Sequence, residues 1–268
     1  MHYYSSGKYL EAPALPATET EPGLFETVLF NGSTIAHLDR HIERITSSAR
    51  ALGITMPNMQ HRQIEEIFQE LIQRNRLSDG EARLNLYCFQ NREPMLTAQA
   101  YTRPPMEAVS LSLYKASSQY LHKSTNRTHL DQARNTALGR GYFDALLTDS
   151  SGTFLETTIS GLIINTDKGL AVTPPKARLN SIAVSLVSPP GTTPSIKLRK
   201  DDLSHIINIW TVNSLAGALP VGRIDDISLS PDPKLAMEFN QLIRGEYPAT
   251  TRRSTTPLGS AHGRATRS

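Results

Sequence analysis

The stretch YLHKSTNRTHLDQAR, residues 120–134, decides how the second half of the chain is read. It places a lysine, Lys123, between a short apolar run and Asn126-Arg127-Thr128, a sequence typical of a helix start. A lysine is usually a solvated surface charge, and its neighbours are then unconstrained. The pattern alone therefore favours a surface role for Lys123, and a functional role depends on the rest of the chain.

The composition is that of a globular protein, with 38% hydrophobic and 20% charged residues among 268. The net charge of +3 comes from the segment 249–268, which carries four arginines and no acid, so that the remaining residues sum to −1. This Ser/Thr/Gly/Arg tail has almost no apolar content and is expected to be disordered. The basic balance therefore predicts no nucleic-acid partner, and we expect truncation after Pro248 to leave activity intact.

The cellular compartment is indicated by three features. No apolar run approaches the ~18 residues of a membrane span, and the polar start MHYYSSGKYLEAP lacks the apolar region of a signal peptide. Cys88 is a single cysteine and cannot form an internal disulfide. We therefore expect a cytoplasmic protein with no membrane partner.

Hydrophobic periodicity predicts strands and helices in the first half. Residues 24–30 (LFETVLF) are typical of a strand and end at Asn31-Gly32, a hairpin signal. Helical spacing of apolar residues then predicts two helices, over 37–53 and 59–76. Further strands are predicted over 83–89, 96–102 and 109–115, and the break at 103–105 (RPP) lies near the middle of the chain.

The second half is expected to contain one clear helix, over 128–138, followed by short strands. These strands are predicted over 143–148, 154–156, 162–165, 170–173 and 209–213, with further helices over 180–187 and 201–207. The fold class is therefore α+β or mixed α/β with two lobes. The predicted domains are an N-terminal lobe (1–105), a connecting segment or strand (106–118), a C-terminal lobe (119–248) and the tail.

Several common catalytic motifs are missing from the sequence. It contains no G-x-G-x-x-G after a strand, no Walker A motif, no H-E-x-x-H and no G-x-S-x-G. His37 and His41 have helical i, i+4 spacing, but no third metal ligand lies near them in the sequence, so no metal site is predicted.

Five motifs, in order along the chain, carry a resemblance to a known family. They are GLFETVLFNG, HIERITSSARALGI, HKSTNR with the following ARNTALGRGYFDALLTDSSGTFLETTISGLI, VTPP, and VNSLAGALPVGRID. Together they resemble the class IV pyridoxal-phosphate aminotransferases, which include branched-chain aminotransferases, D-amino acid aminotransferases and aminodeoxychorismate lyases. The similarity spans residues 20–230. It implies a two-lobed class IV fold like that of D-amino acid aminotransferase, in which residues 119–248 form the cofactor-binding lobe.

The resemblance also implies the roles of particular residues. Lys123 matches the lysine that holds pyridoxal phosphate as an imine and later moves protons. Glu156 matches the acid that faces the cofactor's ring nitrogen, which must be protonated for the ring to accept electrons. Phosphate binding is implied for Arg44, for a helix N-terminus at Ser181 and Ile182, and for the hydroxyl of Ser214.

The chain departs from the family pattern in three places. The family usually has SNLF after the glutamate, whereas residues 160–163 read SGLI and lack the asparagine. Many members carry a basic residue shortly after FET, where this chain has Leu29. The segment between VTPP and Asn213 is shorter than usual by about one or two helical turns.

The particular activity is indicated by the sequence spacing between Lys123 and Asn126, which is one residue shorter than in branched-chain enzymes. The shorter form, together with GLFETV and NSLAGALPV, is most similar to aminodeoxychorismate lyases. The implied reaction converts 4-amino-4-deoxychorismate to 4-aminobenzoate and pyruvate in folate synthesis, in a homodimer. The alternatives are a class IV aminotransferase, of the D-amino acid or branched-chain type, and a relative that has lost its cofactor function.

Overall fold

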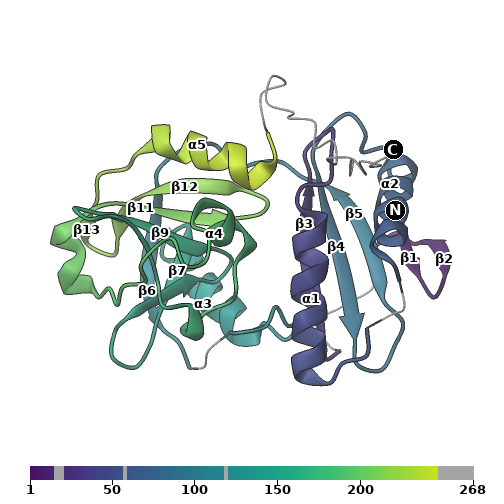
Figure 1. Cartoon of the computed structure of the whole chain (residues 1–268), viewed down its shortest axis with the longest axis horizontal. Coiled ribbons are helices and arrows are strands. Elements are labelled where there is room, and N and C mark those ends of the chain that lie inside the picture. Colours follow the sequence, from purple (N-terminus) through teal and green to yellow (C-terminus); the bar gives the residue numbers. More distant parts are fainter. Residues whose placement is uncertain (15–20, 57–58, 118–119, 247–268) are drawn as a thin grey trace, which may run out of the picture.

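A computed structural model describes residues 1–14, 21–56, 59–117 and 120–246, which form two lobes side by side (Figure 1). The tail 249–268, predicted to be disordered, lies outside the described residues. None of the helices in the described ranges combines the length and apolar character that a membrane crossing needs.

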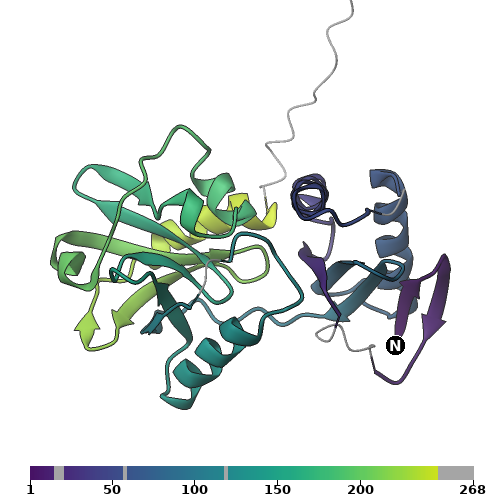
Figure 2. The same cartoon turned by 90° about the horizontal axis from the view of Figure 1, so that it is seen from below.

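The N-terminal lobe is an antiparallel sheet of five strands in the order β2-β1-β5-β4-β3. Two helices, α1 and α2, lie on the same side of this sheet (Figure 2). The elements are β1 (His2–Ser5), β2 (Lys8–Glu11), β3 (Gly23–Phe30), α1 (Leu38–Leu52), α2 (His61–Arg74), β4 (Ala82–Phe89) and β5 (Met95–Ala100).

Strand β3 has one face toward the core of the lobe and the other toward a cavity. Leu24, Val28 and Phe30 are buried in the core under the two helices, as their period of two requires. Phe25 and Thr27 point the other way and line a cavity that faces the second lobe. Helix α1 ends where predicted, because Gly53 adopts a left-handed conformation with φ of 67°.

The C-terminal lobe contains an eight-stranded sheet in the order β10-β9-β11-β12-β6-β7-β8, with β13 paired to β12. Strand β6 runs parallel to both of its neighbours, β12 and β7, and the other pairs are antiparallel. The strands are β6 (Val109–Lys115), β7 (Asp144–Thr148), β8 (Phe154–Thr157), β9 (Gly161–Thr166), β10 (Gly169–Val172), β11 (Ile206–Asn213), β12 (Gly217–Ile224) and β13 (Ile227–Ser228).

Three α-helices cover this second sheet. They are α3 (Thr128–Gly139), which packs on β7, α4 (Ile182–Val187) and α5 (Pro233–Arg244), which packs on β12. The mostly apolar side chains of α4 and α5 meet Trp210 and Ile163 in a shared core. Two short 3-10 helices are present as well, Pro175–Ala177 and Lys200–His205.

The structure corrects the sequence prediction in several places. The turn at Asn31-Gly32 reverses the chain as predicted, with an antiparallel bridge between Phe30 and Ile35, and Asn31 Oδ1 accepts hydrogen bonds from the N–H groups of Ser33 and Thr34. No full second strand follows, because the chain enters α1 directly after this bridge. The segment predicted as a helix over 201–207 is a 3-10 turn followed by β11. Strands β1, β2, β12 and β13 and helix α5 were not predicted.

The two lobes are joined by backbone pairing at the segment that contains Lys123. The N–H of Phe25 donates to the carbonyl of Lys123 at 2.9 Å, and the N–H of Thr125 donates to the carbonyl of Gly23 at 2.9 Å. A β-bridge between Leu24 and Ser124 lies between these bonds. Lys123 is therefore held at the junction of the lobes by the first strand of the family motif.

Candidate active site

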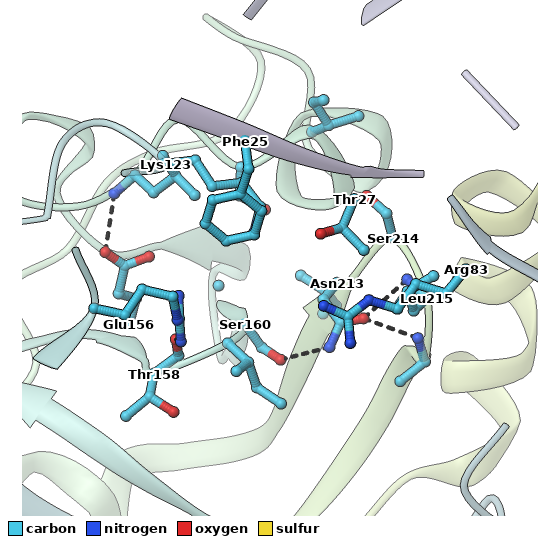
Figure 3. A pocket seen from close by; sticks show the side chains of 18 of the residues that line it. Phe25, Thr27, Arg83, Lys123, Glu156, Thr158, Ser160, Asn213, Ser214 and Leu215 are labelled. Carbon is cyan, nitrogen blue, oxygen red and sulfur yellow. Dashed lines mark hydrogen bonds between the residues drawn. The ribbon is translucent and has the colours of Figure 1, made fainter. Parts of the chain in front are cut away.

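A cavity of about 650 Å³ lies between the lobes and is lined by residues from both. All six residues predicted for the site line it: Arg44, Lys123, Glu156, Ser181, Ile182 and Ser214. Figure 3 shows Lys123, Glu156 and Ser214 around this space, together with Phe25, Thr27 and Arg83 of the N-terminal lobe. Residues far apart in the sequence are thus brought to one site, while their individual roles stay predictions.

Lys123 has the properties of a nucleophilic amine. Burial and, to a smaller extent, the nearby charge of Arg44 lower the pKa of Lys123 to about 7, against the opposing effect of Glu26. Its Nζ lies 4.5 Å from the centre of the Phe25 ring, a contact that an ammonium and a neutral amine can both make. A substantial share of Lys123 is therefore uncharged at neutral pH, as attack on an aldehyde requires.

Glu156 is a buried carboxyl at the third position of β8. Its Oε1 accepts a hydrogen bond of 2.9 Å from the backbone N–H of Leu179. Burial raises the pKa of Glu156 to about 7, although the hydrogen bond from Leu179 and the charge of Arg178 oppose the shift. A carboxyl with such a pKa can hold or share a proton with a nitrogen base at neutral pH.

Arg44 reaches the cavity from α1 and is fixed by a buried acid that the sequence analysis did not single out. Its Nε and Nη2 donate to the two oxygens of Glu26 at 2.7 and 2.5 Å, and Nη1 donates to the carbonyl of Asn180 at 2.9 Å. Glu26 also forms a hydrogen bond of 2.7 Å with Nδ1 of His41. His41, considered above as a metal ligand, is thus a partner of this buried acid. Three of the five guanidinium N–H donors are thereby used to orient Arg44.

The helix start predicted at Ser181 and Ile182 is present. Ser181 is the N-cap of α4, and its hydroxyl accepts from the N–H of Val184. The neighbouring Gly161 explains the missing asparagine of the family motif, because a Cβ at Gly161 would lie 2.5 Å from Cγ2 of Val184. A side chain at position 161 would therefore require Val184 or α4 to shift.

Ser214 lies in the turn between β11 and β12, and Asn213 holds this turn in shape. The Oδ1 of Asn213 accepts from the backbone N–H groups of Leu215 and Ala216 at 3.0 and 2.8 Å. Its Nδ2 donates to Ser160 Oγ at 2.9 Å, as Figure 3 shows. The N–H groups of Leu215 and Ala216 are thus bonded within the turn, and Ser214 lines the cavity.

The donor set fits pyridoxal phosphate. The group needs an uncharged lysine for its aldehyde, an acid for its ring nitrogen, and positive charge with hydroxyls for its phosphate. Lys123, Glu156, Arg44, Ser181 and Ser214 supply these groups in one cavity. The two departures at Gly161 and in the shortened segment before Asn213 remove none of them.

Comparison with known proteins places the chain in a family. Residues 23–224 match the model of the class IV amino-transferases, which is most of the chain, and the chain belongs to this family. The predicted family, fold class and enzyme class are thereby confirmed. No match was found among curated protein sequences.

Solved structures with the same fold cover nearly the whole chain. A hypothetical aminotransferase from Mycobacterium tuberculosis is 21% identical with a TM-score of 0.76, over 91% of this chain and 97% of that one. The same description is given to a form that contains pyridoxal phosphate, in agreement with the predicted cofactor. A branched-chain aminotransferase from Thermoproteus uzoniensis is 16% identical with a TM-score of 0.78, over 92% and 95% of the two chains.

A third similar structure comes from Legionella pneumophila and carries a provisional assignment as a 4-amino-4-deoxychorismate lyase. It is 23% identical with a TM-score of 0.73, over 89% of this chain and 98% of that one. At these identities the likeness establishes the fold, and the reaction has to be argued from the site.

Proposed function

We propose that the chain is a pyridoxal-phosphate-dependent lyase that converts 4-amino-4-deoxychorismate to 4-aminobenzoate and pyruvate. The main support for an enzyme is that a lysine with a lowered pKa, Lys123, and a buried acid, Glu156, line the same cavity between the lobes. The choice of the lyase is supported by the short step from Lys123 to Asn126 and by the motif GLFETV.

The residues divide the work as follows. The bound cofactor supplies an electron-accepting pyridine ring. Glu156 keeps a proton at the ring nitrogen, and Arg44, Ser181 and Ser214 hold the phosphate. Lys123 Nζ takes a proton from the ring carbon that bears the substrate's amine.

The bonds then rearrange within the substrate. The bond from the neighbouring ring carbon to the enolpyruvyl oxygen breaks, its electrons leave with that oxygen, and the electrons of the broken C–H bond complete the aromatic ring. The released enol takes up a proton and becomes pyruvate, so no oxidant or reductant is needed. Because aromatisation drives the reaction, the protein mainly has to position the lysine and the substrate.

Two measurements test this proposal separately. The first reduces the holoenzyme with borohydride and finds the cofactor by peptide mass spectrometry on the peptide that contains Lys123. The variant Lys123→Ala should carry none, while Lys197→Ala, a change at an exposed lysine, should be labelled like the wild type. A wild-type protein that takes up no cofactor would refute every enzyme proposal.

The second measurement supplies 4-amino-4-deoxychorismate and follows pyruvate with a coupled dehydrogenase. We expect pyruvate and 4-aminobenzoate in equal amounts, and none from Lys123→Ala. Formation of glutamate from 2-oxoglutarate and an amino donor, without pyruvate release, would instead assign the chain as an aminotransferase.

The proposal includes a cytoplasmic homodimer, on the resemblance and on the single cysteine. Light scattering of the purified protein should give twice the chain mass of 29.6 kDa. A monomer with full activity would refute the dimer without affecting the reaction.

A further inference from the structure

The last turn of helix α5 contacts the turn that carries Ser214 from behind. Arg244 of α5 is fully buried, and its Nη1 donates to the carbonyl of Leu215. Leu215 and Ser214 line the cavity, and Arg244 lies behind them, outside the lining. Figure 1 shows this end of α5 at the boundary between the lobes. The guanidinium therefore supports the wall of the cavity without reaching a ligand in it.

The peptide group between Leu215 and Ala216 is fixed at both of its polar atoms. Its N–H, which belongs to Ala216, donates to Asn213 Oδ1 at 2.8 Å, and its carbonyl accepts from Arg244. The N–H and the carbonyl of a planar trans peptide point in opposite directions, so two such bonds prevent the plane from rotating. Figure 3 shows Ser214 directly beside this peptide and Asn213 below it. The orientation of Ser214 is thereby set together with that of the peptide.

A second side chain of α5 fixes the chain just after the turn. Asn240 accepts from the N–H of Ala218 at 2.7 Å and donates to the carbonyl of the same residue at 3.2 Å. It can approach this closely because residue 217 is a glycine with φ of 79°, where a Cβ would lie 1.8 Å from Asn240 Oδ1. Helix α5 thus holds the turn at two points, and Arg244 contacts the part that lines the cavity.

We propose that Arg244 is a positioning residue for the cofactor's phosphate, because it fixes the turn and so holds the hydroxyl of Ser214 in place for the phosphate. This inference rests on the proposed function, which assigns the phosphate to Arg44, Ser181 and Ser214. A hydroxyl that is already ordered binds more tightly than one that has to be ordered when the ligand arrives. Arg244 differs from Arg44 in acting only through the turn.

The test compares two ligands on the full-length apoprotein. Pyridoxal phosphate and pyridoxal share the aldehyde and the ring, and pyridoxal lacks the phosphate. The absorbance change on attachment to Lys123 gives a dissociation constant for each. Arg244→Gln should weaken the binding of pyridoxal phosphate by about tenfold, as expected for a lost hydrogen bond to a charged group, and that of pyridoxal by less than about twofold. A general loss of folding would weaken both ligands alike.

Two further variants separate the turn from the stability of the protein. Glu81→Gln removes an ion-pair partner of Arg244 in the other lobe but leaves the bond to Leu215. The ratio of its two dissociation constants, phosphate form to pyridoxal, should therefore stay within about twofold of wild type. Arg244→Lys keeps a cation for Glu81 but loses the planar fork, so its ratio should lie between those of wild type and Arg244→Gln. Where Arg244→Gln does not fold, a wild-type ratio in Arg244→Lys overturns the inference.

A double variant shows whether Arg244 acts through Ser214. Ser214→Ala alone should raise the ratio by about tenfold, because it removes the hydroxyl. Since Arg244 acts by placing that hydroxyl, Ser214→Ala/Arg244→Gln should stay within about twofold of Ser214→Ala, and not show the roughly hundredfold rise of two independent effects.

A wild-type ratio in a folded Arg244→Gln protein, or independent effects in the double variant, would overturn the inference and leave the proposed function standing. A wild-type protein that binds neither ligand would refute the proposed function and this inference with it.

Discussion

At the scale of single residues, Lys123 and Glu156 illustrate how burial prepares a site. Lysine is normally charged at neutral pH, and a carboxyl is normally ionised. Burial shifts the pKa of each to about 7, from opposite directions, because both charged forms lose hydration. One residue is thereby able to accept a proton and the other to hold one under the same conditions.

This pKa predicts how the apoprotein takes up its cofactor. The amine of Lys123 is uncharged above its lowered pKa, so the rate of covalent attachment should rise from about pH 6 to about pH 8 and then level off. Stopped-flow absorbance after mixing with pyridoxal phosphate measures this rate. N-acetyl-lysine methylamide under the same conditions should continue to rise beyond pH 9, as expected for an ordinary lysine pKa of about 10.4. A protein rate that follows the model amine would contradict the assignment.

The sequence predicted part of this residue-scale picture. Lys123, Glu156 and Arg44 were found because their neighbours form motifs. Glu26 and Asn213 lie inside the same motifs, and their roles depend on contacts to α1 and to a turn that become visible only in three dimensions. Arg83 was not predicted as a cavity residue, because an arginine on a predicted strand is usually solvated. It lines the cavity because the strand register sets it opposite Leu29 of β3, on the face of Phe25 and Thr27.

At the scale of elements, the contact of β9 with α4 depends on Gly161. A methyl group there would meet Val184, whose branched side chain has little freedom to move away. Gly161→Ala should therefore lower the free energy of unfolding by about 1–3 kcal/mol. Urea denaturation measures this, and Gly139→Ala is the control, because nothing lies within 4 Å of a Cβ at that helical position.

The same contact predicts that the effects of substitutions at Gly161 and Val184 on stability are coupled. In the double variant Gly161→Ala/Val184→Ala the new methyl group occupies space that the valine has vacated. The double variant should therefore be more stable than the sum of the two single effects allows, by at least about 0.5 kcal/mol. Additive single effects would show that the contact is not the cause.

The ion pair between Glu26 of β3 and Arg44 of α1 predicts that the stability of the protein falls at acid pH. The ion pair and the bond from His41 hold the pKa of Glu26 at about 2, below its usual 4.5, despite burial. A group with a lowered folded-state pKa contributes stability above its unfolded pKa, and loses it as the pH falls from 4.5 toward 2. Unfolding free energies of wild type should fall over this range, and Glu26→Gln should reduce that slope.

Glu26→Gln should also cost about 3 kcal/mol near neutral pH, because it leaves Arg44 without its anionic partner. The comparison is Glu66→Gln, which breaks an exposed pair with Arg62 and should cost less than about 1 kcal/mol. Similar losses in the two variants would mean that Glu26 contributes no more than a surface residue.

Most elements followed from periodicity, and those that were missed have identifiable reasons. Helix α5 carries clear signals, with Asp232 as N-cap, Pro233 in the first turn and Gly245 after its end, so it was predictable. Strand β12 contains Pro220, which argues against a central strand. The structure accommodates it because β12 pairs with β6 only from Val221 onward.

At the scale of the whole molecule, the end of α5 ties the two lobes together behind the cavity. Arg244 is fully buried and pairs with Glu81 of the N-terminal lobe and with Glu246. It also donates to the carbonyl of Leu215, in the turn that presents Ser214. Asn31 of the N-terminal lobe donates to the carbonyl of Arg244 at 3.0 Å, so this one residue contacts both lobes.

Arg244→Gln should therefore destabilise the protein by about 3 kcal/mol, because Glu81 and Glu246 lose the buried cation with which they pair. The loss is measured by urea denaturation of the full chain. Arg74→Gln, which removes an exposed partner of Glu70 on α2, should change stability by less than about 1 kcal/mol. A stability close to wild type in Arg244→Gln would show that the lobes are held by their other contacts.

The close approach at Gly161 has a consequence for the evolutionary history of the chain. Relatives with asparagine at this position and the present chain with Val184 cannot be linked by a single neutral substitution at 161, because the asparagine would meet the valine. On the path from an ancestor with asparagine at 161, that side chain has to be lost before a valine occupies position 184 with α4 in its present place. The two positions thus impose an order on the mutations that separate this chain from its ancestors, and reconstructed intermediates should be viable along one order and poorly folded along the other.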